Sequence, residues 1–86
     1  MEHIIKRDGK VVAFDSNKIK IAITKAFEST KEVNYTEEEQ ETIINKVIEK
    51  IIALKKDQTI EQIQDTVEKQ LLKTAPMVGK NFLIYR

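Results

Sequence analysis

The sequence predicts a single α+β domain that is mostly helical, with an N-terminal β-hairpin packed on a four-helix bundle. Turn residues separate two short apolar runs near the start, and apolar residues then recur at helical spacing in three segments. A fourth short apolar segment begins at Pro76, a residue favoured at the first helical position. Because 86 residues suffice for one domain only, the predicted domain covers residues 1–86.

Residues 3–14 are predicted to form the hairpin. Asp8-Gly9 is typical of a two-residue type I′ turn, in which both central residues need positive φ. Counting outward from this turn pairs Ile5 with Val12 on one face and places Lys6 on the other. An isolated hairpin is only marginally stable in water, so this one is expected to pack on helices.

The first helix is predicted to begin at the N-cap signal Asp15-Ser16 and to end near Ser29-Thr30. Apolar residues follow the cap at i, i+3, i+4, i+7 and i+8, which gives one apolar stripe. The stripe consists of Ile19, Ala22, Ile23, Ala26 and Phe27.

Two capping boxes mark the starts of the next two helices. They lie at residues 36–39 and 59–62, and each precedes an apolar stripe of helical period. The stripes contain Ile44, Val47, Ile48, Ile51 and Ile52 in the first case, and Ile60, Ile63, Val67 and Leu71 in the second.

The composition excludes several kinds of site. Only two glycines are present, whereas a P-loop or a dinucleotide fingerprint needs several in register. No cysteine is present and His3 is the single histidine, so no metal site and no catalytic triad are expected. Paired carboxylates at residues 37–39 lie on a solvated helix start, and the chain is therefore not expected to be an enzyme.

No apolar run approaches the roughly 20 residues that span a bilayer, and no signal peptide is evident, so a cytoplasmic protein without a membrane partner is expected. The net charge of +1 and 6% aromatic content disfavour nucleic acid as a partner. Both ends are nevertheless basic and the middle is acidic. If the fold brings the ends together, a cationic pocket for a compact anion results; otherwise these charges are solvated helix faces.

Lys6, Arg7 and Lys18 are the cations best placed for such a pocket. Lys18 lies on the first helical turn, where the helix dipole favours an anion, and Lys6 and Arg7 lie on the adjacent strand. Arg supplies a bidentate fork and Lys a point charge, so the three could converge on a polyphosphate. Alternatively, Lys6 and Arg7 protect a sheet edge and Lys18 is an ordinary exposed lysine.

Several segments also match a known family in order and spacing. They are Ile4-Ile5-Lys6-Arg7-Asp8-Gly9, Phe14-Asp15, Lys18-Ile19, Ala22-Ile23, Ile63-Gln64-Asp65-Thr66-Val67-Glu68 and Phe82-Leu83-Ile84-Tyr85-Arg86. Together they resemble the ATP-cone, a regulatory nucleotide-binding domain at the N-terminus of many ribonucleotide reductases. The resemblance covers nearly the whole chain.

The resemblance implies that the domain binds ATP or dATP as an allosteric effector, with Mg²⁺ helping to neutralise the phosphates. It implies a partner in the catalytic domain of a parent reductase, which would carry the radical chemistry, and a possible homo-oligomer through cone surfaces. The segment does not decide the class of that parent; the anaerobic, glycyl-radical class is one candidate.

The same resemblance implies nucleotide-binding residues. Lys6, Arg7 and Lys18 match phosphate-contacting positions, whereas Ile63 and Gln64 match positions near the base and ribose. The full expected set is Ile4, Ile5, Lys6, Arg7, Asn17, Lys18, Ile63, Gln64 and Arg86. One departure is Val12, which stands where many members have Glu, so effector selectivity is less certain than binding.

Two other functions stay open at this point. A small helical interaction module without nucleotide binding would use an exposed apolar surface, for which Ile21 is a candidate. A nucleic-acid binder is disfavoured by the acidic middle and the few aromatic residues.

Overall fold

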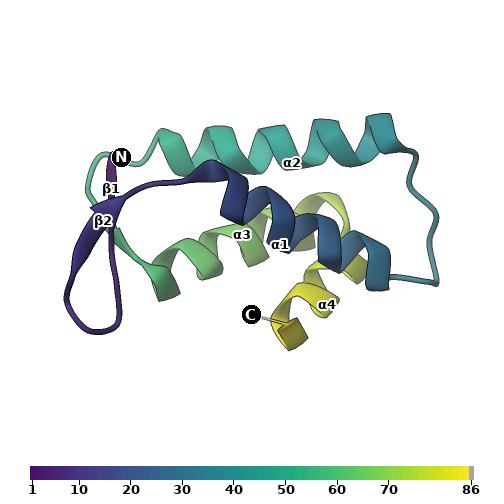
Figure 1. The fold of residues 1–86 in the computed structure, drawn as a ribbon. Helices are drawn as coiled ribbons and strands as arrows, with labels where there is room; N and C mark the ends of the chain where they lie inside the picture. Colours follow the sequence, from purple (N-terminus) through teal and green to yellow (C-terminus); the bar gives the residue numbers. More distant parts are fainter. Residues whose placement is uncertain (86) are drawn as a thin grey trace.

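The computed structural model describes residues 1–85 and confirms the α+β class. The elements are β1 (His3–Ile5), β2 (Val11–Ala13), α1 (Ser16–Ser29), α2 (Glu37–Ile52), β3 (Gln58–Thr59), α3 (Ile60–Thr74) and α4 (Pro76–Tyr85). Helices α1, α2 and α3 run along the length of the molecule, with the small sheet at one end and α4 against the lower side of the bundle (Figure 1).

The predicted caps are all present, and they explain where the helices begin. Asp15 caps α1 by accepting a hydrogen bond from the Asn17 N–H at 3.0 Å. Thr36 exchanges hydrogen bonds with Glu39, and Thr59 does so with Gln62, which completes both capping boxes. Pro76 is the first residue of α4.

The hairpin turn differs from the prediction. The Gly9 N–H donates to the Lys6 carbonyl and the Lys6 N–H donates to the Lys10 carbonyl, both at 2.8 Å. Gly9 has φ 85°, and no described residue other than glycine has positive φ. A type I′ turn would need positive φ at Asp8 as well, so the two-residue turn is wrong. The loop instead has three residues and ends in a left-handed glycine.

This longer loop shifts the strand register by one residue. Ile4 pairs with Val12 and Ile5 with Val11. Because side chains alternate across a strand, the shift puts Ile4, rather than Ile5, on the face that packs against the hydrophobic core.

A third strand, absent from the prediction, attaches the hairpin to the helices. β3 pairs in parallel with β1, so the strand order is β2-β1-β3. The His3 N–H extends this edge by donating to Asp57 Oδ1 at 3.2 Å. Since β3 ends where α3 begins, the sheet fixes the start of α3 beside the hairpin.

The core confirms most of the predicted stripes. Its fully buried side chains come from all four helices: Ile23, Val47, Ile51, Ile63, Val67, Leu71 and Val78. Phe27 also contacts Tyr35 edge to face, with ring centroids 5.3 Å apart, which holds the loop between α1 and α2 on the core. Ile52, predicted to belong to the α2 stripe, is half exposed because α2 ends at this residue.

The helices do not all approach one another equally. Within the described residues, α1 packs on α2 and α4, and α3 packs on the same two helices, whereas α1 and α3 are not a closely packed pair. This arrangement leaves room for a cavity between α1 and α3.

Candidate functional site

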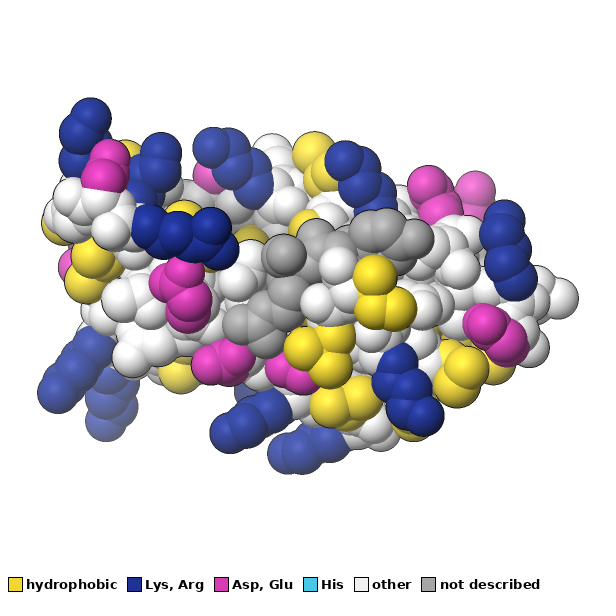
Figure 2. Space-filling model, turned by 90° about the horizontal axis from the view of Figure 1, so that it is seen from below, with side chains coloured by type: hydrophobic (Ala, Val, Ile, Leu, Met, Phe, Trp, Pro, Cys, Tyr) yellow, Lys and Arg dark blue, Asp and Glu magenta, His cyan; other side chains and the backbone are white. Residues whose placement is uncertain are grey.

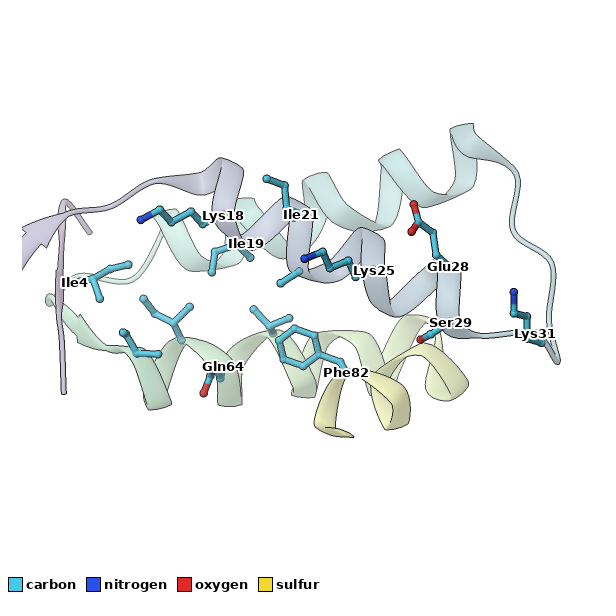
Figure 3. A pocket seen from close by; sticks show the side chains of 14 residues that line it. Ile4, Lys18, Ile19, Ile21, Lys25, Glu28, Ser29, Lys31, Gln64 and Phe82 are labelled. Carbon is cyan, nitrogen blue, oxygen red and sulfur yellow. The ribbon is translucent and has the colours of Figure 1, made fainter. Parts of the chain in front are cut away.

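A cavity of about 740 Å³ lies between α1 and α3. Its volume falls within the roughly 300–1,000 Å³ typical of small-molecule sites. β1 closes one end and α4 contributes part of the wall (Figure 3). The apolar side chains that line it include Ile4, Ile19, Ala22, Ile60, Ile63, Val67 and Phe82.

Lys18 is the cation at the hairpin end of this cavity. It lies in the first turn of α1, is exposed, and extends its side chain toward the sheet (Figure 3). The helix start itself is less open than expected, because the Asp15 carboxylate already accepts the Asn17 N–H. The amine of Lys18, rather than the backbone of the helix start, is therefore the main attraction for an anion at this end.

A second group of polar side chains lies at the far end of the cavity. Lys25 and Glu28 on α1 line it, and Lys31 follows shortly after the helix (Figure 3). The sequence analysis did not assign these residues to the site. A sequence signal for Lys25 did exist: Lys18, Ala22 and Lys25 recur at helical spacing, so these three residues share one face of α1.

Four of the expected site residues line the cavity together. Ile4 comes from β1, Lys18 from α1, and Ile63 and Gln64 from the second turn of α3. Ile63 is buried, whereas Gln64 is half buried and directs its amide away from α1 (Figure 3).

The other expected residues lie elsewhere. Ile5 is on the opposite face of β1 from Ile4, and Asn17 is exposed in the first turn of α1 without lining the cavity. Lys6 and Arg7 flank the hairpin turn outside the cavity lining. Arg86 lies outside the described residues.

Arg7 is engaged by a carboxylate from α3. Its Nε donates to Glu61 Oε1 at 2.6 Å, and both side chains are more than half exposed. Lys6 and Lys18, by contrast, form no ion pair within residues 1–85. Of the three expected phosphate-binding cations, Arg7 alone is already paired in this structure.

The described residues contain no cluster of three or more His, Asp or Glu side chains that could hold a metal ion. No helix among them is both long and apolar enough to cross a membrane.

Residues 2–86 match the ATP cone domain. The chain belongs to the ATP-cone family. This result agrees with the resemblance seen in the sequence and with the observed hairpin on four helices. The general role of domains of this family is allosteric nucleotide binding.

Curated relatives of this ATP-cone are much longer proteins. The vitamin B12-dependent ribonucleoside-diphosphate reductase of Thermoplasma acidophilum is 38% identical over 92 aligned residues, covering 100% of this chain and 12% of that protein. The ribonucleoside-diphosphate reductase subunit alpha of Chlamydia pneumoniae is 36% identical over 91 residues, covering 96% and 9%. The Chlamydia muridarum subunit is 33% identical over 93 residues. The chain thus spans about a tenth of the length of these relatives.

Proposed function

We propose that this ATP-cone binds ATP or dATP, with Mg²⁺, in the cavity between α1 and α3. We further propose that it serves as the overall-activity domain of a ribonucleotide reductase whose catalytic groups lie in another part of the parent protein. The observation that carries the proposal is a cavity of nucleotide size, with apolar walls from α1, α3 and β1 and with Lys18 at its hairpin end, in a chain of this family.

The apolar walls suit a flat base. Ile19 from α1 and Ile63 from α3 face the cavity from opposite sides, and Ile4 closes the end near the sheet. A base held there would lose water-exposed apolar area, which is the main source of affinity in such a pocket.

The polar groups suit a triphosphate and a ribose. A triphosphate directed at Lys18 would emerge toward the hairpin, whose turn is flanked by the cationic side chains of Lys6 and Arg7. Gln64, whose amide both donates and accepts, lines the cavity from α3 and is our candidate for the ribose hydroxyls, which it would reach by turning its amide toward α1 (Figure 3).

Calorimetry and thermal unfolding of the 86-residue chain with ATP and dATP, each with Mg²⁺, test this proposal. We expect heat of binding and a rise in melting temperature that grows with ligand concentration, because a ligand specific for the folded state stabilises it by RT ln(1 + [L]/Kd). Adenosine is the control that lacks phosphates and should bind more weakly. Absence of heat and of any thermal shift at millimolar triphosphate would contradict the proposal.

A second candidate is a protein-interaction module. The observation in its favour is exposed apolar surface: Ile21 is 56% exposed at the rim of the cavity, and Leu72, Leu83 and Ile84 are exposed on α3 and α4. Hydrophobic side chains gather on the face that carries these two helices (Figure 2). A domain of this second kind would show no thermal shift with nucleotides, so the same experiment separates the two.

A further inference from the structure

The ion pair between Arg7 and Glu61 joins the hairpin turn to the first turn of α3. These residues are 54 positions apart in the sequence, and Glu61 follows shortly after β3, the strand that pairs with β1. The contact is therefore a tertiary one, formed only when the hairpin is seated on the helices.

Glu61 lies in the first turn of α3, next in sequence to a residue that lines the cavity. The residue before it, Ile60, lines the cavity, and so does Gln64 one helical turn later. The carboxylate of Glu61 thus places a negative charge close to the end of the cavity where Lys18 could bind an anion. A triphosphate that reached the hairpin would meet this charge and would find Arg7 already occupied.

We propose that Glu61 competes with the nucleotide phosphates for Arg7 and thereby lowers the affinity of the domain for triphosphates. In the free domain Glu61 holds Arg7, and binding of a triphosphate transfers the guanidinium from the carboxylate to a phosphate oxygen. The inference rests on the proposed function, because it requires a phosphate-bearing ligand at the Lys18 end of the cavity.

The exposure of the pair makes this exchange feasible. The side chains of Arg7 and Glu61 are 71% and 51% exposed, so the attraction between them is screened by water and is weak. A triphosphate offers Arg7 several negatively charged oxygens, including bidentate contacts, which a single Nε–Oε1 hydrogen bond does not match. Once the nucleotide is bound, Arg7 should therefore pair with the phosphate rather than with Glu61. The cost of breaking the ion pair with Glu61 reduces the free energy gained on binding.

A double-mutant cycle tests the proposal. E61Q keeps the shape of the side chain and removes its charge, so it should tighten ATP binding by about 1.5-fold to fivefold, the range for an exposed ion pair. In an R7A background the same substitution should give a smaller gain, because no guanidinium remains to be released. E49Q, which neutralises an exposed carboxylate on α2, is the matched control and should leave affinity unchanged.

The choice of ligand supplies a second readout. Inorganic tripolyphosphate should show the same gain in E61Q as ATP, whereas adenosine should show none, since it brings no charge to the hairpin. A merely structural role of Glu61 would shift the melting temperature of the free domain and would affect adenosine and ATP alike.

The outcomes separate clearly. A gain confined to phosphate-bearing ligands and reduced in the R7A background supports the proposal. If E61Q raised triphosphate affinity equally with and without Arg7, the Glu61 charge would repel the phosphates directly. If E61Q did not raise affinity at all, Glu61 would not compete for Arg7. Either result overturns the inference while leaving nucleotide binding intact. If the unaltered domain binds no triphosphate at all, the proposed function fails together with this inference.

Discussion

The side-chain amide of Asn81 on α4 donates a hydrogen bond to the hydroxyl of Thr30, at 2.7 Å, where α1 ends. The Thr30 hydroxyl in turn donates to the Ala26 carbonyl at 2.7 Å and is buried. One hydroxyl therefore closes the last turn of α1 and fixes α4 against it, at the end of the bundle opposite the sheet.

Replacing Thr30 by Val should lower the free energy of unfolding by about 1–2 kcal/mol. The shape of the side chain is kept, but the Asn81 amide loses its acceptor and the Ala26 carbonyl keeps only the hydrogen bond from the Ser29 hydroxyl. Urea unfolding measures the change. Thr42→Val is the control, because the Thr42 hydroxyl bonds to its own helix at an exposed position and its loss should stay within about 0.5 kcal/mol.

Replacing Gly79 by Ala should destabilise the domain by about 1–3 kcal/mol, although Ala is the better helix former. A Cβ at this position would lie 2.9 Å from the backbone nitrogen of Leu72, so α3 and α4 would have to move apart. Thermal unfolding tests this, with the neighbouring exposed Lys80→Ala as the control. An unchanged or higher melting temperature in the Gly79 variant would show that the helices separate at little cost.

Replacing Lys18 by Ala should weaken triphosphate binding by roughly 1.5–3 kcal/mol, the range for hydrogen bonds to charged groups. Lys6→Ala should also weaken binding, but by less, because Lys18 lines the cavity and Lys6 does not. Calorimetry gives both values, and Lys50→Ala on α2 is the control for loss of one positive charge. A lower melting temperature with unchanged affinity would show that Lys18 is structural.

ATP and dATP should bind with affinities within about tenfold of each other, since they differ by one ribose hydroxyl. Different effects on the parent enzyme would then come from the surface that each complex presents, because a ligand shifts an equilibrium only by its differential affinity for the two states. Exposed Ile21 and the start of α4 near Met77 are our candidates for that surface. Sedimentation of the parent protein with each nucleotide tests this; identical oligomers with different activities would place the signal within one chain.

Local signals in the sequence predicted the helices well. Each cap is a contact between residues at most three apart, as in the pair Thr36 and Glu39, so the pattern needs no knowledge of the rest of the fold. The hairpin register was predicted wrongly because Asp-Gly suits both a two-residue type I′ turn and a three-residue loop that ends in a left-handed glycine. The two differ in whether Asp8 has positive φ, which the residue type alone does not determine.

The cavity could be predicted only in part. Lys18, Ile63 and Gln64 were expected in the site and do line it, but the polar residues at its far end were missed. Their helical spacing gave a local signal, but a cavity beside that face of α1 depends on α2 and α4, which hold α1 and α3 apart. That separation is a tertiary property. The pairing of Arg7 with Glu61 was likewise unforeseen, since it depends on the third strand.

The parallel pairing of β1 with β3 has a consequence for the order of folding. It joins the two ends of a loop of more than fifty residues, and the entropy of closing such a loop must be met before the contact forms. The helices between the strands have local contacts and should form first, so β1, which closes one end of the cavity, is added last. Protection of the His3 amide, which donates to Asp57 Oδ1 across this edge, against hydrogen exchange should then appear late in refolding. Nucleotide added during refolding should act only on chains that have closed this loop.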